Sequence, residues 1–290
     1  MNILYIVMGG AEALRYYMEA YLSIRTFQKQ ITAEDRIFVV TDHPEMMARA
    51  GVEIITISED EKTEWMGQHK FFFRTKIRAV QHLSHFRPRE SILYLDSDTF
   101  LFGNLSTLRQ RLNDGKGLMH VCEGHPLNIS NTARRLYRKA EGHTYAGITV
   151  GKNHMMWNAG VVGIPAGKVN DVMQTSLSLC DGMLDDGANT FITEQYASSI
   201  AMKENTSLME AADVIGHYWG NKDDWEQLAN RIFLRAYMQN LTLEEELAML
   251  DIYELCKTPV RVHHSHRGEQ LHCLVSRWFP DKDKQLVKQP

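Results

Sequence analysis

Two aspartates separated by one residue, Asp96 and Asp98, directly follow the apolar run at residues 91–95. Residues two apart on an extended backbone project to the same side, so both carboxylates could ligate one cation, either directly or with one acting through water. An acidic pair at the end of a buried strand is costly unless a cation or hydrogen-bond donors neutralise it. Carboxylate ligands favour manganese or magnesium over zinc. We therefore expect a divalent metal site here, and the plainer alternative is a solvated acidic turn.

The place of this pair in the chain indicates what the cation could do. Ligands of open α/β sheets bind beyond the carboxyl ends of the strands. A cation at such an edge would clamp a diphosphate and neutralise the charge that grows on it as a leaving group. The apolar residues that continue after Asp98, at 99–105, favour this interpretation over a bare surface turn.

The elements that must position these carboxylates can be predicted from hydrophobic periodicity. Apolar, β-branched segments predict strands at 2–7, 36–41, 52–57 and 91–95, and helical spacing predicts helices at 11–29 and 67–86. This alternation predicts a parallel sheet with helices on both faces. Further on we expect strands at 117–122 and 157–164, and helices at 132–140, 169–184, 190–203 and 225–255, with residues 212–216 leading the chain to His217. We expect an α/β fold with a mixed sheet, a domain at 1–224 and a C-terminal helical extension with a tail at 225–290.

Composition bounds the class of protein. The chain has 290 residues, 44% of them hydrophobic, and a formal net charge of -4. A nucleic-acid binder usually shows a strongly basic patch, so no nucleic-acid partner is expected. The four cysteines lie far apart without a CxxC pair, which is typical of reduced thiols. With no 20-residue apolar segment and no leader-like N-terminus, we expect a cytoplasmic location.

The run at residues 94–105, YLDSDTFLFGNL, resembles the metal-binding strand end of GT-A fold glycosyltransferases, especially family 8 and its relatives. The likeness extends from residue 1 to about 222. It implies a Rossmann-like GT-A fold and transfer of a hexose from a nucleotide diphosphate sugar to a glycan or lipid-linked acceptor. A UDP-sugar donor, a Mn²⁺ or Mg²⁺ cofactor and retention of anomeric configuration by front-face attack follow from the same resemblance.

The resemblance also implies roles for individual residues. His217 would be the third metal ligand beside Asp96 and Asp98, and imidazole suits manganese because it adds no charge. Catalytic or sugar-contacting residues would be Asn158, Glu194 and Gln195. The remaining donor-binding residues would be Met8 through its backbone amide, Asp42 through ribose hydroxyls, and Lys76, Ser97, Gly220 and Lys222.

Several of these roles have alternatives. The family usually places its lysine further after the glycine and follows it with Pro-Trp, whereas here Lys222 comes early. Lys76 and Arg74 are two apart on a helix and point to different sides, so at most one faces the donor, and we favour Lys76. Asp42 could instead be an N-cap for a helix at Pro44. Asn158 could be a turn residue, and Glu194 a surface charge.

Other interpretations concern the whole protein. A phosphatase of the haloacid dehalogenase type also ends a strand with D-x-D, but it wants a threonine two positions after the second aspartate, and here Thr99 follows Asp98 directly. A non-catalytic sugar-nucleotide binder, or a self-glycosylating primer using one of the 11 tyrosines, is a further alternative. If the reaction inverts, Glu194 or Asp186 would serve as the base.

The C-terminal segment carries two features of its own. His263, His264 and His266 form a cluster that could supply a ligand or contact the acceptor. The tail from 277 to 290 combines four basic residues with Trp278 and Phe279, and could touch the inner face of a membrane. The plainer interpretation of both is an ordinary polar tail.

Overall fold

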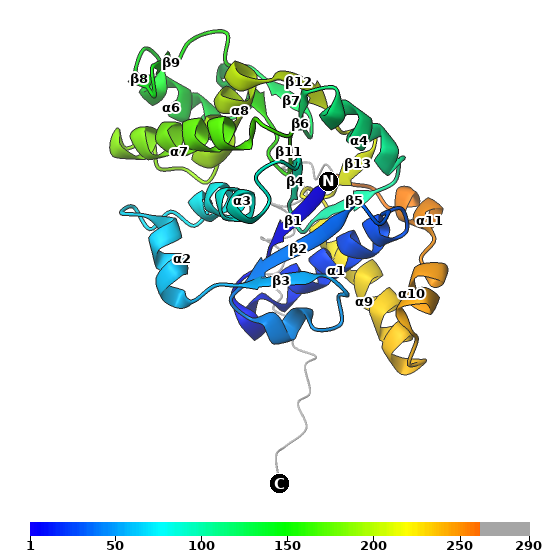
Figure 1. Cartoon of the computed structure of the whole chain (residues 1–290). Coiled ribbons are helices and arrows are strands. Elements are labelled where there is room, and N and C mark those ends of the chain that lie inside the picture. Colours follow the sequence, from blue (N-terminus) through cyan, green and yellow to red (C-terminus); the bar gives the residue numbers. More distant parts are fainter. Residues whose placement is uncertain (262–290) are drawn as a thin grey trace, which may run out of the picture.

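The structure, a computed structural model, describes residues 1–261 and is built on a seven-stranded sheet (Figure 1). The strands lie in the order β12-β6-β11-β4-β1-β2-β3. Neighbouring strands are parallel except at β11, which is antiparallel to both β4 and β6. Their bounds are β1 (Asn2–Ile6), β2 (Arg36–Thr41), β3 (Glu53–Thr56), β4 (Ile92–Leu95), β6 (Lys116–Met119), β11 (Val161–Ile164) and β12 (Ser207–Glu210). The predicted α/β class with a mixed sheet is confirmed.

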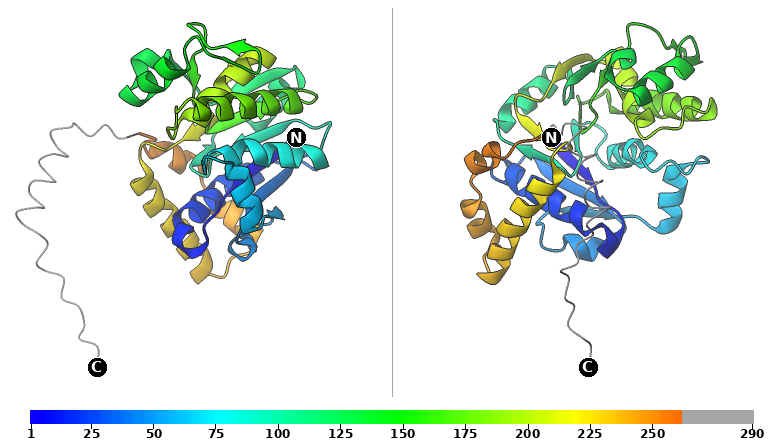
Figure 2. Two further views of the ribbon diagram at one scale, coloured as in Figure 1. Left: turned by 90° about the vertical axis from the view of Figure 1, so that its left-hand side faces the viewer. Right: turned by 180° about the vertical axis from the view of Figure 1, so that it is seen from behind.

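Helices cover both faces of this sheet. Strand side chains alternate between faces, so Ile3 and Tyr5 of β1 pack against α1 and α4, whereas Leu4 packs towards α3, α7 and α8. Figure 2 shows α3 and α7 side by side in both views, with α1 on the opposite side of the sheet. The bounds are α1 (Leu14–Gln28), α3 (Arg74–Phe86), α4 (Leu105–Asn113), α7 (Val169–Asp185) and α8 (Thr193–Asn205). The sheet is therefore held between two apolar cores, one on each face.

The direction of strand addition reverses between β1 and β4. The chain builds β1, β2 and β3 outwards on one side and then returns to place β4 on the other side of β1. In open α/β sheets the crevice at such a switch point is where ligands bind. Met8, shortly after β1, and Asp96, directly after β4, lie at this crevice. The acidic pair thus occupies the place that the topology reserves for a ligand.

The C-terminal helices pack beside α1, as Figure 2 also shows. They are α9 (Lys222–Met238), α10 (Leu243–Met249) and α11 (Ile252–Lys257). Trp225 is fully buried and stacks on Tyr218 with 4.2 Å between ring centroids, next to Phe100 and Leu22. The helical extension is confirmed, while the domain division at residue 224 stays a prediction. In the part of the chain that the structure describes, no helix has the length and apolarity needed to cross a bilayer.

Two predicted segments are divided and a third is shortened. The helix expected at 67–86 begins only at Arg74, as α3, because residues 67–73 form a loop with positive φ at Gly67 and Lys70, and α2 (Glu59–Met66) before this loop was not expected. The strand expected at 157–164 is β10 (Met156–Trp157) and β11, separated by a bend at Asn158, whose Oδ1 accepts a hydrogen bond from the Gly160 amide. The helix expected at 225–255 breaks at residues 240–242, where Thr242 forms a capping box that begins α10.

The remaining elements are short. They are η1 (Gly10–Ala13), η2 (Pro44–Met47), β5 (Thr99–Leu101), β7 (Cys122–Gly124), α5 (Pro126–Ile129), α6 (Asn131–Ala140), β8 (Thr144–Tyr145), β9 (Ile148–Thr149) and β13 (Ile215–His217). β12 was not expected from the sequence. Its side chains are mostly exposed, so it lacks the apolar alternation that marked the other strands.

Candidate metal and donor site

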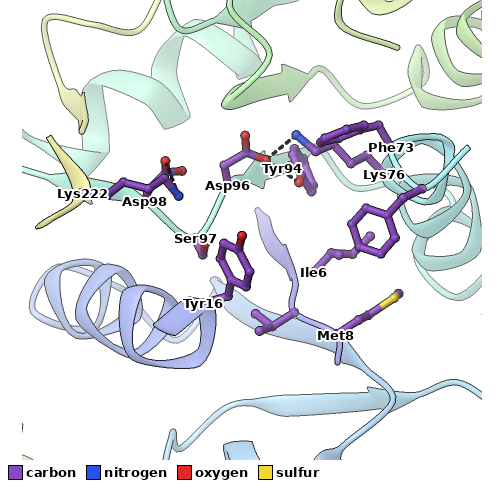
Figure 3. A pocket seen from close by; sticks show the side chains of 12 residues that line it. Ile6, Met8, Tyr16, Phe73, Lys76, Tyr94, Asp96, Ser97, Asp98 and Lys222 are labelled. Carbon is purple, nitrogen blue, oxygen red and sulfur yellow. Dashed lines mark hydrogen bonds and ion pairs between the residues drawn. The ribbon is translucent and has the colours of Figure 1, made fainter. Parts of the chain in front are cut away.

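A cavity of about 360 Å³ lies at the switch point (Figure 3). Figure 3 shows Lys222 beside Asp98 on one side of it and Lys76 beside Asp96 on the other. The cavity size falls in the range of small-molecule sites, about 300–1,000 Å³. Its lining combines apolar and charged side chains: Ile6, Val7, Met8, Tyr16, Phe72, Phe73, Lys76, Tyr94, Asp96, Ser97, Asp98 and Lys222.

Strand pairing brings His217 to the aspartates from far along the sequence. β5 and β13 pair antiparallel with His217 opposite Thr99, and the Tyr218 amide donates to the Asp98 carbonyl over 3.0 Å. Ligand atoms of Asp96, Asp98 and His217 consequently all lie within 4.8 Å of one another. The three predicted metal ligands therefore meet at one place.

Both oxygens of the Asp98 carboxylate are occupied by partners. Oδ1 lies 3.2 Å from Nε2 of His217, and Oδ2 lies 3.0 Å from Nζ of Lys222. Burial acts to raise the pKa of Asp98, but the neighbouring His217 and Lys222 outweigh it and hold that pKa well below its usual range. Asp98 is therefore an anion at neutral pH and available as a ligand.

A chain of hydrogen bonds orients the His217 ring. Asn158 Nδ2 donates to Glu123 over 3.1 Å, which turns its Oδ1 towards the Gly160 amide and His217 Nδ1, at 3.0 Å each. Because Oδ1 only accepts, Nδ1 must carry a proton. In the neutral ring the lone pair then lies on Nε2, the form that binds metals.

The lone pair on Nε2 of His217 bears on whether the site fits a cation. An unprotonated Nε2 facing the carboxylate of Asp98 would place two acceptors 3.2 Å apart. Either a second proton on His217 or a cation must lie between them. The two carboxylates would supply oxygen ligands to such a cation. The donor set therefore suits Mn²⁺ or Mg²⁺.

A glycine permits the close approach of His217. A Cβ built on Gly160 would lie 2.2 Å from Cε1 of the His217 ring, a distance that no ordinary contact allows. The Gly160 carbonyl also accepts from the Asp96 amide over 2.9 Å. The predicted Asn158-Ala159-Gly160 segment thus contacts two of the candidate metal ligands, His217 and Asp96.

Asp96 is held by a lysine and a tyrosine. Its Oδ1 accepts from Nζ of Lys76 over 2.7 Å and from the Tyr94 hydroxyl over 2.6 Å. Burial acts to lower the pKa of Lys76, but Asp96 and Glu194 raise it above its ordinary value, so the ammonium stays charged. Arg74 instead makes two hydrogen bonds to Asp181 of α7, over 2.7 and 3.0 Å. Of the two basic residues weighed from the sequence, only Lys76 reaches the cavity.

Glu194 and Gln195 begin α8 behind this layer. Glu194 is 4% exposed, and burial raises its pKa to about 7 although Lys76 acts to lower it. It is therefore no surface charge. Gln195 donates to Glu123 over 3.0 Å and accepts from the Ala159 amide. Both residues lie next to the site without lining the cavity.

Two residues predicted to contact the donor, Asp42 and Gly220, do not line the cavity. The Asp42 carboxylate is nearly buried and accepts from the Gly9 amide over 2.9 Å and from Lys62 over 2.7 Å. It does not cap the helix at Pro44, where His43 is the N-cap. Gly220 forms a β-bridge with Arg261. Met8, Ser97 and Lys222 do line the cavity.

The sequence analysis missed two carboxylates beside the site. Glu19 of α1 is 2% exposed and lies among the buried, mostly apolar residues of this helix. Glu123 lies in β7, after strand β6, and accepts hydrogen bonds from Asn158 and Gln195. An acidic residue in an apolar helix face, or soon after a buried strand, is the signal that could have found them. The cavity aromatics Tyr16 and Phe72 were missed as well.

The C-terminal candidates cannot be placed beside this site. His263, His264 and His266, and the tail from 277 to 290, lie outside the described residues. Cys122, Cys180 and Cys256 are free thiols, as expected.

Comparison with known proteins gives the fold a name. No protein-family model matches the chain, and no curated protein matches its sequence. The solved structure of galactosyltransferase LgtC, in complex with donor and acceptor sugar analogs, is similar to it with a TM-score of 0.50 and 11% identity, covering 80% of this chain and 96% of that one. Mouse xyloside xylosyltransferase 1 in its apo form also matches, with a TM-score of 0.45, 11% identity and coverages of 72% and 85%. The likeness to LgtC shows that the chain has a GT-A type fold.

Proposed function

We propose that this protein is a metal-dependent glycosyltransferase related to family 8. It transfers a hexose from a nucleotide diphosphate sugar, with UDP favoured, to a glycan or lipid-linked acceptor. The observation that carries the proposal is the convergence of Asp96, Asp98 and His217 at the switch point of a GT-A type fold. A fold hosts many activities, so the argument rests on these side chains.

Each group around the cavity has a proposed task. Asp96, Asp98 and His217 hold Mn²⁺ or Mg²⁺, which when bound neutralises the charge of the departing diphosphate. Lys222 and Lys76 bind phosphate oxygens as charged donors, and both ammonium groups already line the cavity. The pyrophosphate thus meets positive charge from two directions.

The sugar and nucleoside contacts are proposed for residues beside the metal ligands. Asn158, Glu194 and Gln195 lie behind the metal ligands, where a transferred sugar could be oriented by their amide and carboxylate groups. Met8 and Ser97 line the region expected for the nucleoside. Asp42 and Gly220 do not line the cavity, and their contacts with the donor stay predictions.

Retention is proposed because of the carboxylates available. Among the described residues that line the cavity, the acidic side chains are those of Asp96 and Asp98, both assigned to the cation. Of the two bases considered for inversion, Glu194 does not line the cavity, and Asp186, which does not line it either, is bound to Tyr145 and His143. Without a separate base at the reacting carbon, the departing phosphate oxygen accepts the acceptor's proton. Proton NMR of the anomeric centre of the product tests this stereochemistry.

The test of the function is transfer from a panel of nucleotide sugars with Mn²⁺, with and without EDTA. We expect transfer that EDTA abolishes, and loss of transfer in Asp98→Asn because the cation loses a charged ligand. Asp224→Asn, at an exposed acid of α9, is the matched control and should remain active. Metal-independent transfer, or full activity of Asp98→Asn, contradicts the metal assignment.

Two outcomes would support the rival functions. Hydrolysis of p-nitrophenyl phosphate that requires Asp96 indicates a phosphatase. A mass increase of the protein itself after incubation with donor alone indicates self-glycosylation. We expect neither.

A further inference from the structure

Glu19 is a buried acid without a role in the function proposed above. Its side chain is 3% exposed, and it accepts from Ser97 Oγ over 3.0 Å and from Nε of Arg15 over 3.3 Å. Both of its oxygens also lie within hydrogen-bond distance of Lys222 Nζ, at 3.2 and 3.3 Å. A buried carboxylate needs compensation of this kind, and here the compensation is a lysine that lines the cavity.

Lys222 is shared between two carboxylates. Its single ammonium contacts Glu19 of α1 and, over 3.0 Å, Oδ2 of Asp98. A divalent cation bound to Asp98 would repel an ammonium that stays at this distance. The ammonium has three donors, so Lys222 can leave Asp98, keep a hydrogen bond to Glu19 and direct its other donors to a phosphate.

We infer that Glu19 is a positioning residue for Lys222: it is the counterion that retains this lysine at the cavity when a divalent cation takes Asp98. The inference rests on the proposed function, since it concerns the same metal and diphosphate site. Without Glu19, the pair of Lys222 with Asp98 becomes exclusive, and the cation must break it to bind. Glu19 therefore favours metal binding although it is not itself a ligand.

Two other roles for Glu19 fit the contacts less well. It is not a ligand in the cluster that could hold an ion, which within residues 1–261 consists of Asp96, Asp98 and His217. A structural link between α1 and α9 does not require Glu19 to pair with Lys222, because Arg15 also contacts Asp223 and Glu226 of α9, at 3.2 and 3.3 Å.

The experiment measures binding of Mn²⁺ alone by the loss of the free-ion EPR signal. Glu19→Gln keeps the shape of the side chain and an oxygen for one of its two donors, Arg15 on Oε1 or Ser97 on Oε2, but removes the charge that holds Lys222. We expect about 10-fold weaker Mn²⁺ binding or more, the size typical of groups that support metal ligands from outside. Glu226→Gln removes another carboxylate that pairs with Arg15 and is the matched control, with unchanged Mn²⁺ affinity.

A double-mutant cycle tests whether Glu19 acts through Lys222. Lys222→Met frees Asp98, so we expect tighter Mn²⁺ binding and a larger rise of Tm on adding Mn²⁺ than in the wild type. In this background the further change Glu19→Gln should alter Mn²⁺ affinity within about twofold. The same loss in both backgrounds would overturn the inference, because Glu19 would then act on the ion by its own charge.

The outcomes separate this inference from the proposed function. If the wild type binds Mn²⁺ and Glu19→Gln binds it equally well, the role of Glu19 is wrong and the metal site stands. If the folded wild type binds no Mn²⁺, the metal site itself is wrong, and the role of Glu19 is rejected with it. Thermal denaturation of each variant shows whether it is folded.

Discussion

The variant Glu194→Gln should be more stable than the wild type, and this difference in stability should grow as the pH rises. Burial raises the pKa of Glu194 to about 7 from an ordinary value of 4.5, with Lys76 acting against this shift. A carboxyl whose pKa is raised by folding keeps its proton in the native state while the unfolded chain has lost it. The native state of the wild type therefore loses stability as the pH rises from about 4.5 to about 7, and the penalty is complete above that range.

The size of this penalty follows from the two pKa values. They differ by about 2.5, and each unit corresponds to about 1.4 kcal/mol, so the penalty is about 3 kcal/mol for this buried group. Glutamine has the same shape, keeps an oxygen for the Ser198 hydroxyl that donates to Glu194 over 3.0 Å, and does not ionise. Lys76 keeps its ion pair with Asp96 at 2.7 Å.

Urea denaturation of both proteins between pH 4 and pH 8 measures the effect. The free energy of unfolding of Glu194→Gln minus that of the wild type should be near zero at pH 4 and about 3 kcal/mol at pH 8. Glu34→Gln, at an exposed acid, is the control and should show a flat difference. A flat difference for Glu194→Gln would refute the reasoning, because Glu194 would then ionise without a penalty. Reduced transfer in the stabilised variant would link this buried acid to activity.

Three further substitutions test how the site is held. Asn158→Ala removes the acceptor that fixes the His217 ring and should weaken Mn²⁺ binding by about 10- to 100-fold, measured by EPR. Gly160→Ala places a Cβ against that ring, so the free energy of unfolding in urea should fall by about 1–3 kcal/mol and Mn²⁺ binding should weaken. Arg74→Met should lower the free energy of unfolding by about 1 kcal/mol, since its partner Asp181 is partly exposed, and leave Mn²⁺ affinity unchanged. A change in Mn²⁺ affinity in this last variant would place Arg74 in the site.

The fold and the position of Asp96 and Asp98 could be predicted because each depends on a local pattern. Buried parallel strands are continuous apolar runs, so the strands at 36–41 and 91–95 were found almost to the residue. Asp96 and Asp98 follow such a strand, and a strand end fixes where its next residues lie. Helix and strand breaks were harder, because positive φ at Lys70 and the bend at Asn158 depend on contacts that no periodicity encodes.

Pairing between distant residues explains most of what was missed. Glu19 and Glu123 are single acidic residues, and each was missed because its partner lies far along the chain. Glu19 contacts Lys222, 203 positions away, and Glu123 contacts Asn158, 35 positions away. His217 was reached only through a resemblance, since nothing in its neighbourhood says that β13 pairs with β5. Asp42 also follows a strand, but Lys62 and the Gly9 amide contact its two oxygens, so its role at the donor stays a prediction.

The two lysines of the cavity explain how such an acidic site can fold before an ion arrives. Asp96 is neutralised by Lys76 and Asp98 by Lys222, each within 3.0 Å, so neither carboxylate is left as an uncompensated charge. The proposed metal binding at these aspartates would then be an exchange, in which a cation replaces an ammonium that must find another anion. Glu19 and Glu194 stand next to the two lysines that would be displaced, and a bound diphosphate supplies further anionic oxygens. Under the proposed function, the affinity for the metal would therefore depend on how easily the lysines leave as well as on the ligands themselves.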